Sequence, residues 1–143
     1  MAGANHSNEE ERENAIGQMS YLQQMYNERH ALITQEIKGI LETVQEMNNA
    51  LSSLNAVDQI GKRSAMMHMG SDVYTLGTVG EMKTVILGIG GDYLVEKGVD
   101  DAKTLVSGRV ERYNKALQTL MKERSDLENA LVEISYKLES MQV

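Results

Sequence analysis

The chain has 143 residues and a net charge of −7 at pH 7, and it contains no Cys, Trp, Phe or Pro. The lack of Cys excludes disulfides, thiolate catalysis and Cys-ligated zinc. No apolar run approaches the roughly 18 residues of a membrane-spanning helix, and residues 1–7 lack the basic and then apolar layout of a secretory signal. These features predict a soluble, cytoplasmic protein with no membrane partner.

Charge is spread unevenly, but no segment is basic. Residues 1–60 carry nine acids against three bases, residues 61–98 four against four, and residues 99–143 eight against seven. Such a distribution cannot follow a phosphate backbone, so nucleic acid is not an expected partner. Six Tyr are the only aromatic residues, fewer large rings than an enzyme pocket usually buries.

Two long segments have apolar residues every three or four positions, the first from Ile16 to Leu54 and the second from Val106 to Met141. This spacing keeps an apolar seam facing a partner helix. It predicts coiled-coil helices over residues 9–60 and 99–143, packed antiparallel, while residues 1–8 are predicted to be disordered. Ser7 is a candidate cap of the first helix, and Asp100 and Asp101 suit the first turn of the second.

Polar residues interrupt both predicted seams. Gln23 and His30 occupy core positions of the first helix, where they either fix the register or are simply tolerated near the end of the pair. Their place in the N-terminal half favours tolerance. Arg124 interrupts the second seam, and Glu36 is its expected salt partner across the pair.

Residues 61–98 differ from both helices, because eight of the twelve Gly residues lie there. Between the glycines are four strand-like stretches, namely Ser64–Met69, Asp72–Val79, Thr84–Ile89 and Asp92–Lys97. Gly70-Ser71 and Gly90-Gly91 are two-residue hairpin signals. The predicted fold class is therefore α+β and mostly α: a long antiparallel helical hairpin with two β-hairpins inserted as an assembly domain. Such short sheets have open edges, which predicts an oligomer.

The order of these elements resembles the alpha subunit of prefoldin, an ATP-independent chaperone. The segment 84-TVILGIGGDYLVEKGVDDA-102 carries the resemblance, with Gly88-Ile89-Gly90, then Tyr93-Leu94-Val95, and then Glu96-Lys97 before an acidic helix start. Upstream, 69-MGSDVYTLGTV-79 is similar to the Gly turn and second strand of that family. One departure is Met67-His68-Met69-Gly70, where the family usually has a Pro before the apolar-Gly pair.

The resemblance implies a hexamer of two alpha and four beta subunits, joined by hairpins that form a β-barrel platform. It further implies that the coiled-coil tips hold unfolded client proteins and pass them to a group II chaperonin. No nucleotide, metal or other cofactor is expected, and no catalytic residue.

The expected client-binding residues lie near the tips. Leu22, Met25 and Val132 fall outside the seam and would stay partly exposed, whereas the others occupy seam positions and become available when the ends fray. These seam residues are Ile16, Met19, Leu131, Ile134, Leu138 and Met141. The expected assembly residues of the hairpins are Val73, Val79, Val85, Leu87, Ile89, Tyr93 and Val95.

Other functions fit the residues less well. The glycines at 88–91 are not a dinucleotide-binding turn, because Tyr93 stands where the third Gly belongs and a strand follows. His6, His30 and His68 have no metal-ligand spacing, and no Ser or Thr pairs with a His and an acid for catalysis. The alternative that stays open is a structural coiled-coil scaffold or a filament-forming protein of the same fold.

Overall fold

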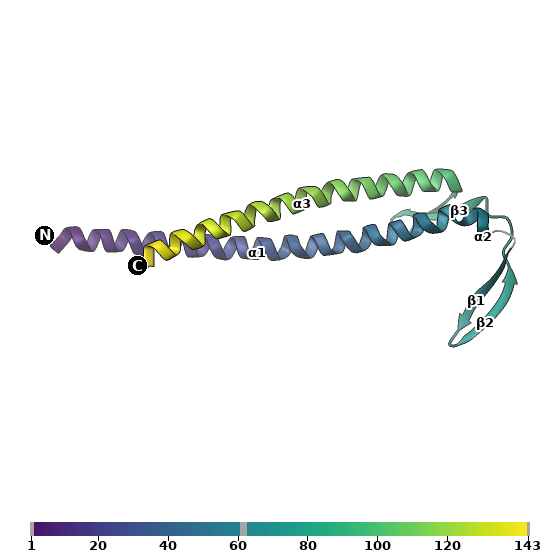
Figure 1. Cartoon of the computed structure of the whole chain (residues 1–143), viewed down its shortest axis with the longest axis horizontal. Helices are drawn as coiled ribbons and strands as arrows, with labels where there is room; N and C mark the ends of the chain where they lie inside the picture. Colours follow the sequence, from purple (N-terminus) through teal and green to yellow (C-terminus); the bar gives the residue numbers. More distant parts are fainter. Residues whose placement is uncertain (1, 61–62, 143) are drawn as a thin grey trace. The chain divides into compact units, whose positions relative to one another are not determined.

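The computed structural model describes residues 2–60 and 63–142 and contains two long helices with four strands between them (Figure 1). In chain order these are α1 (Ala2–Asn55), α2 (Val57–Ile60), β1 (Ser64–Gly70), β2 (Val73–Thr78), β3 (Thr84–Gly90), β4 (Tyr93–Gly98) and α3 (Val99–Gln142). The predicted fold class is confirmed. Met1, Gly61, Lys62 and Val143, which the predicted segments include, lie outside the described residues.

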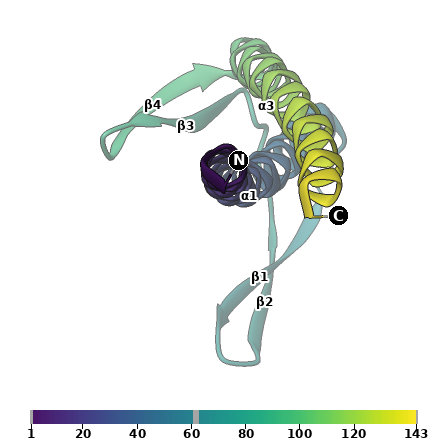
Figure 2. The same ribbon diagram turned by 90° about the vertical axis from the view of Figure 1, so that its left-hand side faces the viewer.

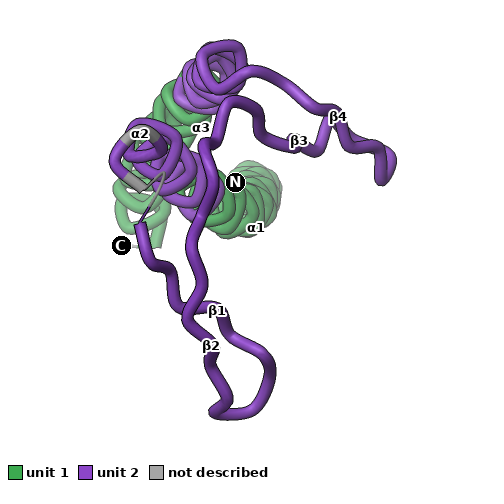
Figure 3. Tube along the Cα trace, turned by 90° about the vertical axis from the view of Figure 1, so that its right-hand side faces the viewer, with its two compact units in different colours: residues 1–41, 115–143 green, residues 42–114 purple. Residues whose placement is uncertain are grey.

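The chain divides into two compact units (Figure 3). Residues 1–41 and 115–143 form the first, here called the coiled-coil unit, and residues 42–114 form the second, the hairpin unit. Within the coiled-coil unit, Arg12 Nε donates to Met141 O at 2.6 Å and Arg29 Nε donates to Glu123 at 2.9 Å. Because partner numbers fall on α3 as they rise on α1, the two helices run antiparallel there.

The seam follows the predicted heptads. The predicted core positions of α1 are residues 16, 23, 30, 37, 44 and 51 at heptad position a and residues 19, 26, 33, 40, 47 and 54 at position d, and all twelve are buried or half-buried. On α3, with a positions counted from residue 103 and d positions from residue 106, only Tyr113, at 37% exposure, falls outside these classes. Ile33 is fully buried, while Ile37 and Ile134 are 4% and 6% exposed. Burying branched aliphatic side chains of this kind contributes about 1.5–3 kcal/mol each, so these three residues stabilise the helix pair most.

The polar seam residues all find partners. Gln23 Nε2 donates to Ser135 Oγ at 3.4 Å, and His30 Nε2 lies 2.9 Å from Glu128 Oε1, so both bond across the pair. These contacts favour a role in fixing register over simple tolerance. The expected Arg124–Glu36 pair was wrong, because Arg124 Nε instead lies 4.0 Å from Glu128, one turn along its own helix.

The first helix begins earlier than predicted. Residues 2–8 are helical in α1 rather than disordered, and Ser7 is not a cap, since its hydroxyl donates to Ala4 O at 3.1 Å inside the helix. Residues 2–15 contain no Pro and no β-branched side chain, and the one Gly, Gly3, lies in the first turn, so α1 extends through Ser7. Figure 1 shows this end of α1 projecting past the end of α3. At the other end, α1 stops at Asn55 instead of continuing to residue 60.

The four strands form two separate antiparallel hairpins, β1–β2 and β3–β4 (Figure 2). Gly70 pairs with Val73 and Gly90 with Tyr93, so the two-residue loops are Ser71-Asp72 and Gly91-Asp92, one residue later than predicted. Gly91 and Asp92 have φ values of 56° and 62°, the left-handed pair that a type I′ hairpin turn requires.

The hairpin unit has a small core of its own. Val57, Ala102 and Val106 are its buried apolar side chains, at 7%, 0% and 5% exposure. Arg109 of α3 donates a hydrogen bond to Gly88 O of β3 at 3.0 Å. This bond ties the second hairpin to the helix that follows it and satisfies a carbonyl on the outer edge of β3.

Candidate client-binding end and assembly hairpins

The two expected kinds of site differ in how they expose apolar side chains. In the coiled-coil unit, the seam residues expected to contact clients are all covered: Ile134 is buried, and Ile16, Met19, Leu131, Leu138 and Met141 are half-buried. The off-seam residues are open, with Leu22 at 37%, Met25 at 46% and Val132 at 56% exposure. The division into seam and off-seam residues is therefore visible in the exposure of the side chains.

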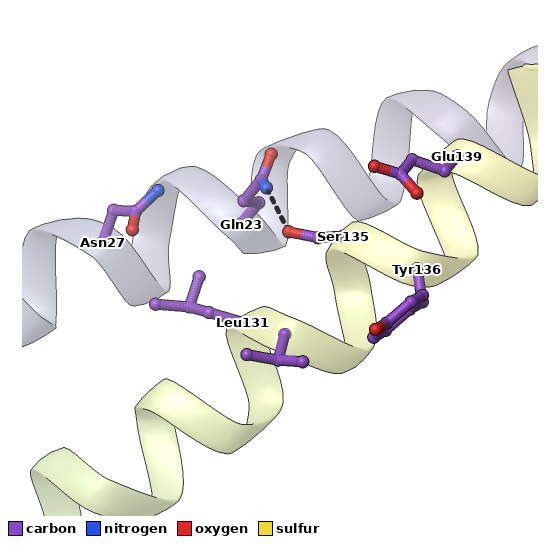
Figure 4. A pocket seen from close by; sticks show the side chains of 7 residues that line it. Gln23, Asn27, Leu131, Ser135, Tyr136 and Glu139 are labelled. Carbon is purple, nitrogen blue, oxygen red and sulfur yellow. Dashed lines mark hydrogen bonds between the residues drawn. The ribbon is translucent and has the colours of Figure 1, made fainter.

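A surface pocket of about 410 Å³ lies on the coiled-coil unit (Figure 4). α1 contributes Gln23 and Asn27, and α3 contributes Leu131, Val132, Ser135, Tyr136 and Glu139. Figure 4 shows the hydrogen bond from Gln23 to Ser135 crossing between the helices at this pocket. Amide, hydroxyl and carboxylate groups thus stand beside two aliphatic side chains, an arrangement that offers both hydrogen bonds and apolar contact.

The expected off-seam residues do not form one patch. In the heptad numbering Leu22 and Met25 occupy g and c positions, on the flank that carries the g–g pair Arg29–Glu123. Val132 lines the pocket with Ser135, which occupies an e position on the opposite flank. The coiled-coil unit therefore presents apolar groups on two flanks, and the described pocket lies on the flank of Val132.

The sequence reasoning missed several exposed residues of this unit. Tyr21, Leu32 and Tyr136 are exposed by 66%, 55% and 70%, and all three lie off the seam. On α1, Tyr21, Met25 and Leu32 are spaced by four and seven residues, so they share one helical face that points away from the seam. The criterion that selected Leu22 and Val132 was an apolar side chain outside the seam. Applied to every position, it also identifies Tyr21, Leu32 and Tyr136.

Electrostatics at this end centre on one exposed ion pair. Arg29 donates to both carboxylate oxygens of Glu123, at 2.9 and 3.2 Å. The hydrogen bond to Glu123, and then its negative charge, raise the pKa of Arg29 above its ordinary value. A guanidinium is charged at physiological pH in any case, and the bidentate geometry holds the two helices in one register.

The hairpins expose apolar side chains on both faces. Among the expected assembly residues, Val73, Ile89 and Tyr93 are exposed by 60%, 51% and 72%, while Val79, Val85, Leu87 and Val95 are half-buried. Leu87 lies opposite Val95 in the ladder, and Val85 opposite Lys97. Since side chains alternate along a strand, Val85 and Leu87 share one face of the second hairpin.

The prediction also omitted residues of the other face and of the first hairpin. Ile86 and Leu94 are exposed by 71% and 70%, and Leu76 by 78%. Met66, Met67, Met69 and Tyr74 are exposed by 50–67% as well. The predicted set included none of these residues. Strands with apolar residues on both faces have almost continuous apolar runs in their sequence instead of alternation.

The described residues were also compared with the requirements of a metal site and of a membrane-spanning helix. Within residues 2–60 and 63–142 no group of three or more His, Asp or Glu side chains could hold a metal ion. The seven residues that line the pocket include no His or Cys. In the same ranges, no helix is both long enough and apolar enough to cross a membrane.

Comparison with known proteins accounts for this architecture. A profile of the family described as "Prefoldin subunit" matches residues 18–143. The chain belongs to the prefoldin subunit family. Among curated relatives, prefoldin subunit alpha of Methanocorpusculum labreanum is 22% identical over 117 residues, which cover 81% of this chain and 80% of the relative.

A second alpha-type relative agrees with this assignment, and a solved structure shows the same fold. Prefoldin subunit alpha of Pyrococcus horikoshii is 22% identical over 99 residues, covering 69% of this chain and 66% of the relative. A chain in the cryo-EM structure of filamentous PFD from Methanocaldococcus jannaschii superposes with a TM-score of 0.54 at 19% identity, covering 82% of this chain and 93% of that chain. The chain is thus an alpha-type member of the prefoldin family, and membership supports a chaperone role rather than catalysis.

Proposed function

We propose that this prefoldin-family chain is the alpha-type subunit of a cytoplasmic, ATP-independent holdase. Its two β-hairpins join it to beta-type subunits, two alpha with four beta, and its coiled-coil end binds non-native proteins and passes them to a group II chaperonin. The main support for client binding is that apolar side chains outside the seam are exposed, above all those of Leu22, Met25 and Val132.

The apolar side chains outside the seam stay exposed in the chain alone and can still be buried by a client. A two-stranded coiled coil buries only its seam, so off-seam apolar groups gain about 25 cal/mol for each Å² that a client covers. Such contacts are weak one by one and tolerant of sequence, and several together add up through linked binding. The pocket beside Val132 adds hydrogen-bonding groups for the backbone of an unfolded segment, in particular Gln23, Asn27 and Ser135.

The test is native mass spectrometry of this chain alone and after mixing with beta-type prefoldin subunits, followed by an aggregation assay. A complex of two copies of this chain with four beta-type subunits, which suppresses aggregation of a denatured protein without ATP, is the expected result. Failure of the assembled complex to suppress aggregation contradicts the holdase function while leaving the assembly role intact.

A matched pair of variants locates the client site. Leu22→Ser with Met25→Ser is expected to reduce client holding and to leave the mass of the hexamer unchanged, because both side chains lie outside the seam. Ser20→Ala with Gln24→Ala, at exposed positions of the same helical segment, serves as the control and is expected to keep holding. Loss of the hexamer in the first variant would show that Leu22 and Met25 are structural.

A second candidate is a structural or filament-forming protein. Two observations favour it. A chain from a filamentous prefoldin structure shares this fold, and this chain has apolar side chains on both faces of its hairpins. Mass spectrometry separates the two functions, since a long homopolymer that ignores beta-type subunits supports a filament protein and contradicts the alpha role.

A further inference from the structure

The two hairpins share one backbone plan, displaced by twenty residues. Ser64 pairs with Thr78 as Thr84 pairs with Gly98, and each register shifts once, between His68 and Gly70 and between Gly88 and Gly90. Each shift inserts one extra residue before a two-residue loop that ends in Asp. The chain therefore contains two hairpins with the same backbone pairing, so β1 and β3 differ mainly in their side chains.

The largest difference is sulfur. Where β3 has Ile86, Leu87 and Ile89, the equivalent positions of β1 are Met66, Met67 and Met69. These three Met residues are exposed by 67%, 50% and 67%. Ten Met residues occur in the chain, and no other described segment of this length exposes three of them.

Each thioether occupies a different part of the first hairpin. Met66 lies opposite Leu76 in the ladder, and Met67 opposite Thr75, so the two point to opposite faces. The terminal methyl of Met67 covers Gly77, where an added Cβ would lie only 2.7 Å from it. Met69 is the extra residue of the bulge and has no residue opposite it. Oxidation at all three positions would therefore place polar groups on both faces and at the turn.

We propose that Met66, Met67 and Met69 form an oxidation site through which a peroxide controls assembly by the first hairpin, resting on the proposed function for the assembly itself. A sulfur lone pair attacks one peroxide oxygen and the O–O bond breaks. The sulfur becomes a sulfoxide, losing two electrons, and the peroxide is reduced to water. The hydrocarbon side chains of β3 do not take part in this reaction, so one oxidant distinguishes the two hairpins.

The consequence follows from burial. A sulfoxide is a polar acceptor, and covering it without a hydrogen-bond donor costs free energy that the thioether does not. Assembly through β1–β2 is expected to weaken by at least about tenfold, which corresponds to 1.4 kcal/mol. Assembly through β3–β4 is unaffected. Once the subunits have assembled, covered thioethers react more slowly, so the site senses oxidant mainly in the free chain.

The experiment treats the unassembled chain with dilute hydrogen peroxide, removes the peroxide with catalase, and locates sulfoxides by peptide mass spectrometry. The treated chain is then mixed with beta-type prefoldin subunits and examined by native mass spectrometry. Sulfoxides at Met66, Met67 and Met69, with loss of complexes that need both hairpins, are expected. Unchanged assembly of a chain oxidised at all three positions overturns the proposal.

The equivalent positions of β3 supply the control variant. Met66→Ile with Met67→Leu and Met69→Ile gives β1 the apolar side chains of β3 and keeps the exposed Met25 and Met121 of the helices. This triple variant is expected to assemble and to keep assembling after peroxide treatment. If peroxide still blocks its assembly, the β1 thioethers are not the site.

Two further outcomes are informative. In the assembled complex, Met66, Met67 and Met69 are expected to react several-fold more slowly than in the free chain, and equal rates would overturn the proposal by showing that no subunit covers them. If the untreated chain fails to assemble with beta-type subunits, the proposed function is wrong. If the chain assembles normally before treatment and equally well after oxidation, only the oxidation proposal is wrong.

Discussion

The seam of the coiled coil and the faces of the hairpins treat similar side chains in opposite ways. Along the seam, Ile33 is fully buried and Ile134 is 6% exposed, whereas in the hairpins Leu76 and Ile86 are 78% and 71% exposed. Both regions are rich in aliphatic residues, so composition does not separate them. The seam is completed by the chain itself, while the hairpins keep apolar surface that their own chain does not cover, as expected of elements that bury it against other subunits.

The largest expected effect follows from placing a charge on a hairpin face. Leu87→Asp, and equally Val85→Asp, is expected to abolish the hexamer, because an unpaired carboxylate covered by a partner subunit costs several kcal/mol. The helices are expected to keep their circular dichroism signal, since neither residue belongs to the seam. Native mass spectrometry with beta-type subunits measures the effect.

The control for added charge is Lys83→Asp, in the loop between the hairpins, where the side chain is 77% exposed. This variant is expected to assemble normally. Intact hexamers from both Val85→Asp and Leu87→Asp would show that this face of β3 stays in solvent, and would leave the face of Ile86 and Leu94 as the assembly surface.

The seam gives the next effect. Ile33→Ala is expected to lower the free energy of unfolding by about 2–4 kcal/mol, because it removes a fully buried side chain and leaves a cavity. Its neighbour Leu32 is 55% exposed, and Leu32→Ala is expected to change stability by no more than about 0.5 kcal/mol. Urea unfolding followed by the helical signal compares them, and equal losses would contradict the assigned heptad register.

A smaller effect is expected at the hairpin turn. Gly90 has a φ of 110° and free space around it, so Gly90→Ala suffers from backbone strain and not from a clash. A cost of about 1–2 kcal/mol is expected to speed amide exchange in β3–β4 by about 5–30-fold. Gly80→Ala is the control, because Gly80 also has open space but no positive φ. Equal exchange in the two variants would mean that the turn conformation is wrong.

The regular parts of this molecule were predictable because they depend on periodicity. A heptad pattern decides which side of a helix is covered, so the seam residues Ile33, Ile37 and Ile134 followed from sequence. The strands followed from the glycines that separate them. The loops were placed one residue too early, because Gly70-Ser71 and Ser71-Asp72 are both acceptable turns, and only the pairing of Gly70 with Val73 chooses between them.

The remaining errors come from features without periodicity. Ser7 has the chemistry of a helix cap, but no Pro lies within residues 2–15, and α1 continues through Ser7. The pocket depends on which residues of α3 lie beside Gln23 and Asn27, and that requires the register between two segments more than 100 residues apart. The separation of Met25 from Val132 onto opposite flanks was missed for a different reason, because residues were classified only as seam or off-seam and not by their heptad positions.

The smallest expected effect concerns the ion pair that joins the helices beside Leu22 and Met25. Arg29 and Glu123 have side chains 45% and 41% exposed, so water and salt screen them, and Arg29→Gln is expected to lower the melting temperature far less than Ile33→Ala does. Because Glu123 raises the pKa of Arg29, the difference between wild type and variant is expected to stay constant across physiological pH as far as this guanidinium is concerned. Salt is expected to reduce it instead, as the screening length falls from about 10 Å at 0.1 M to about 3 Å at 1 M.

Melting curves of wild type and Arg29→Gln at the two salt concentrations measure this salt dependence. Arg12→Gln serves as a second variant, because Arg12 bonds a neutral carbonyl and its loss should respond less to salt. If Arg29→Gln lowered the melting temperature as much as Ile33→Ala does, this end of the coiled coil would depend on charge rather than on its seam. The contrast between a seam that the chain itself covers and hairpins that it leaves exposed would then no longer hold.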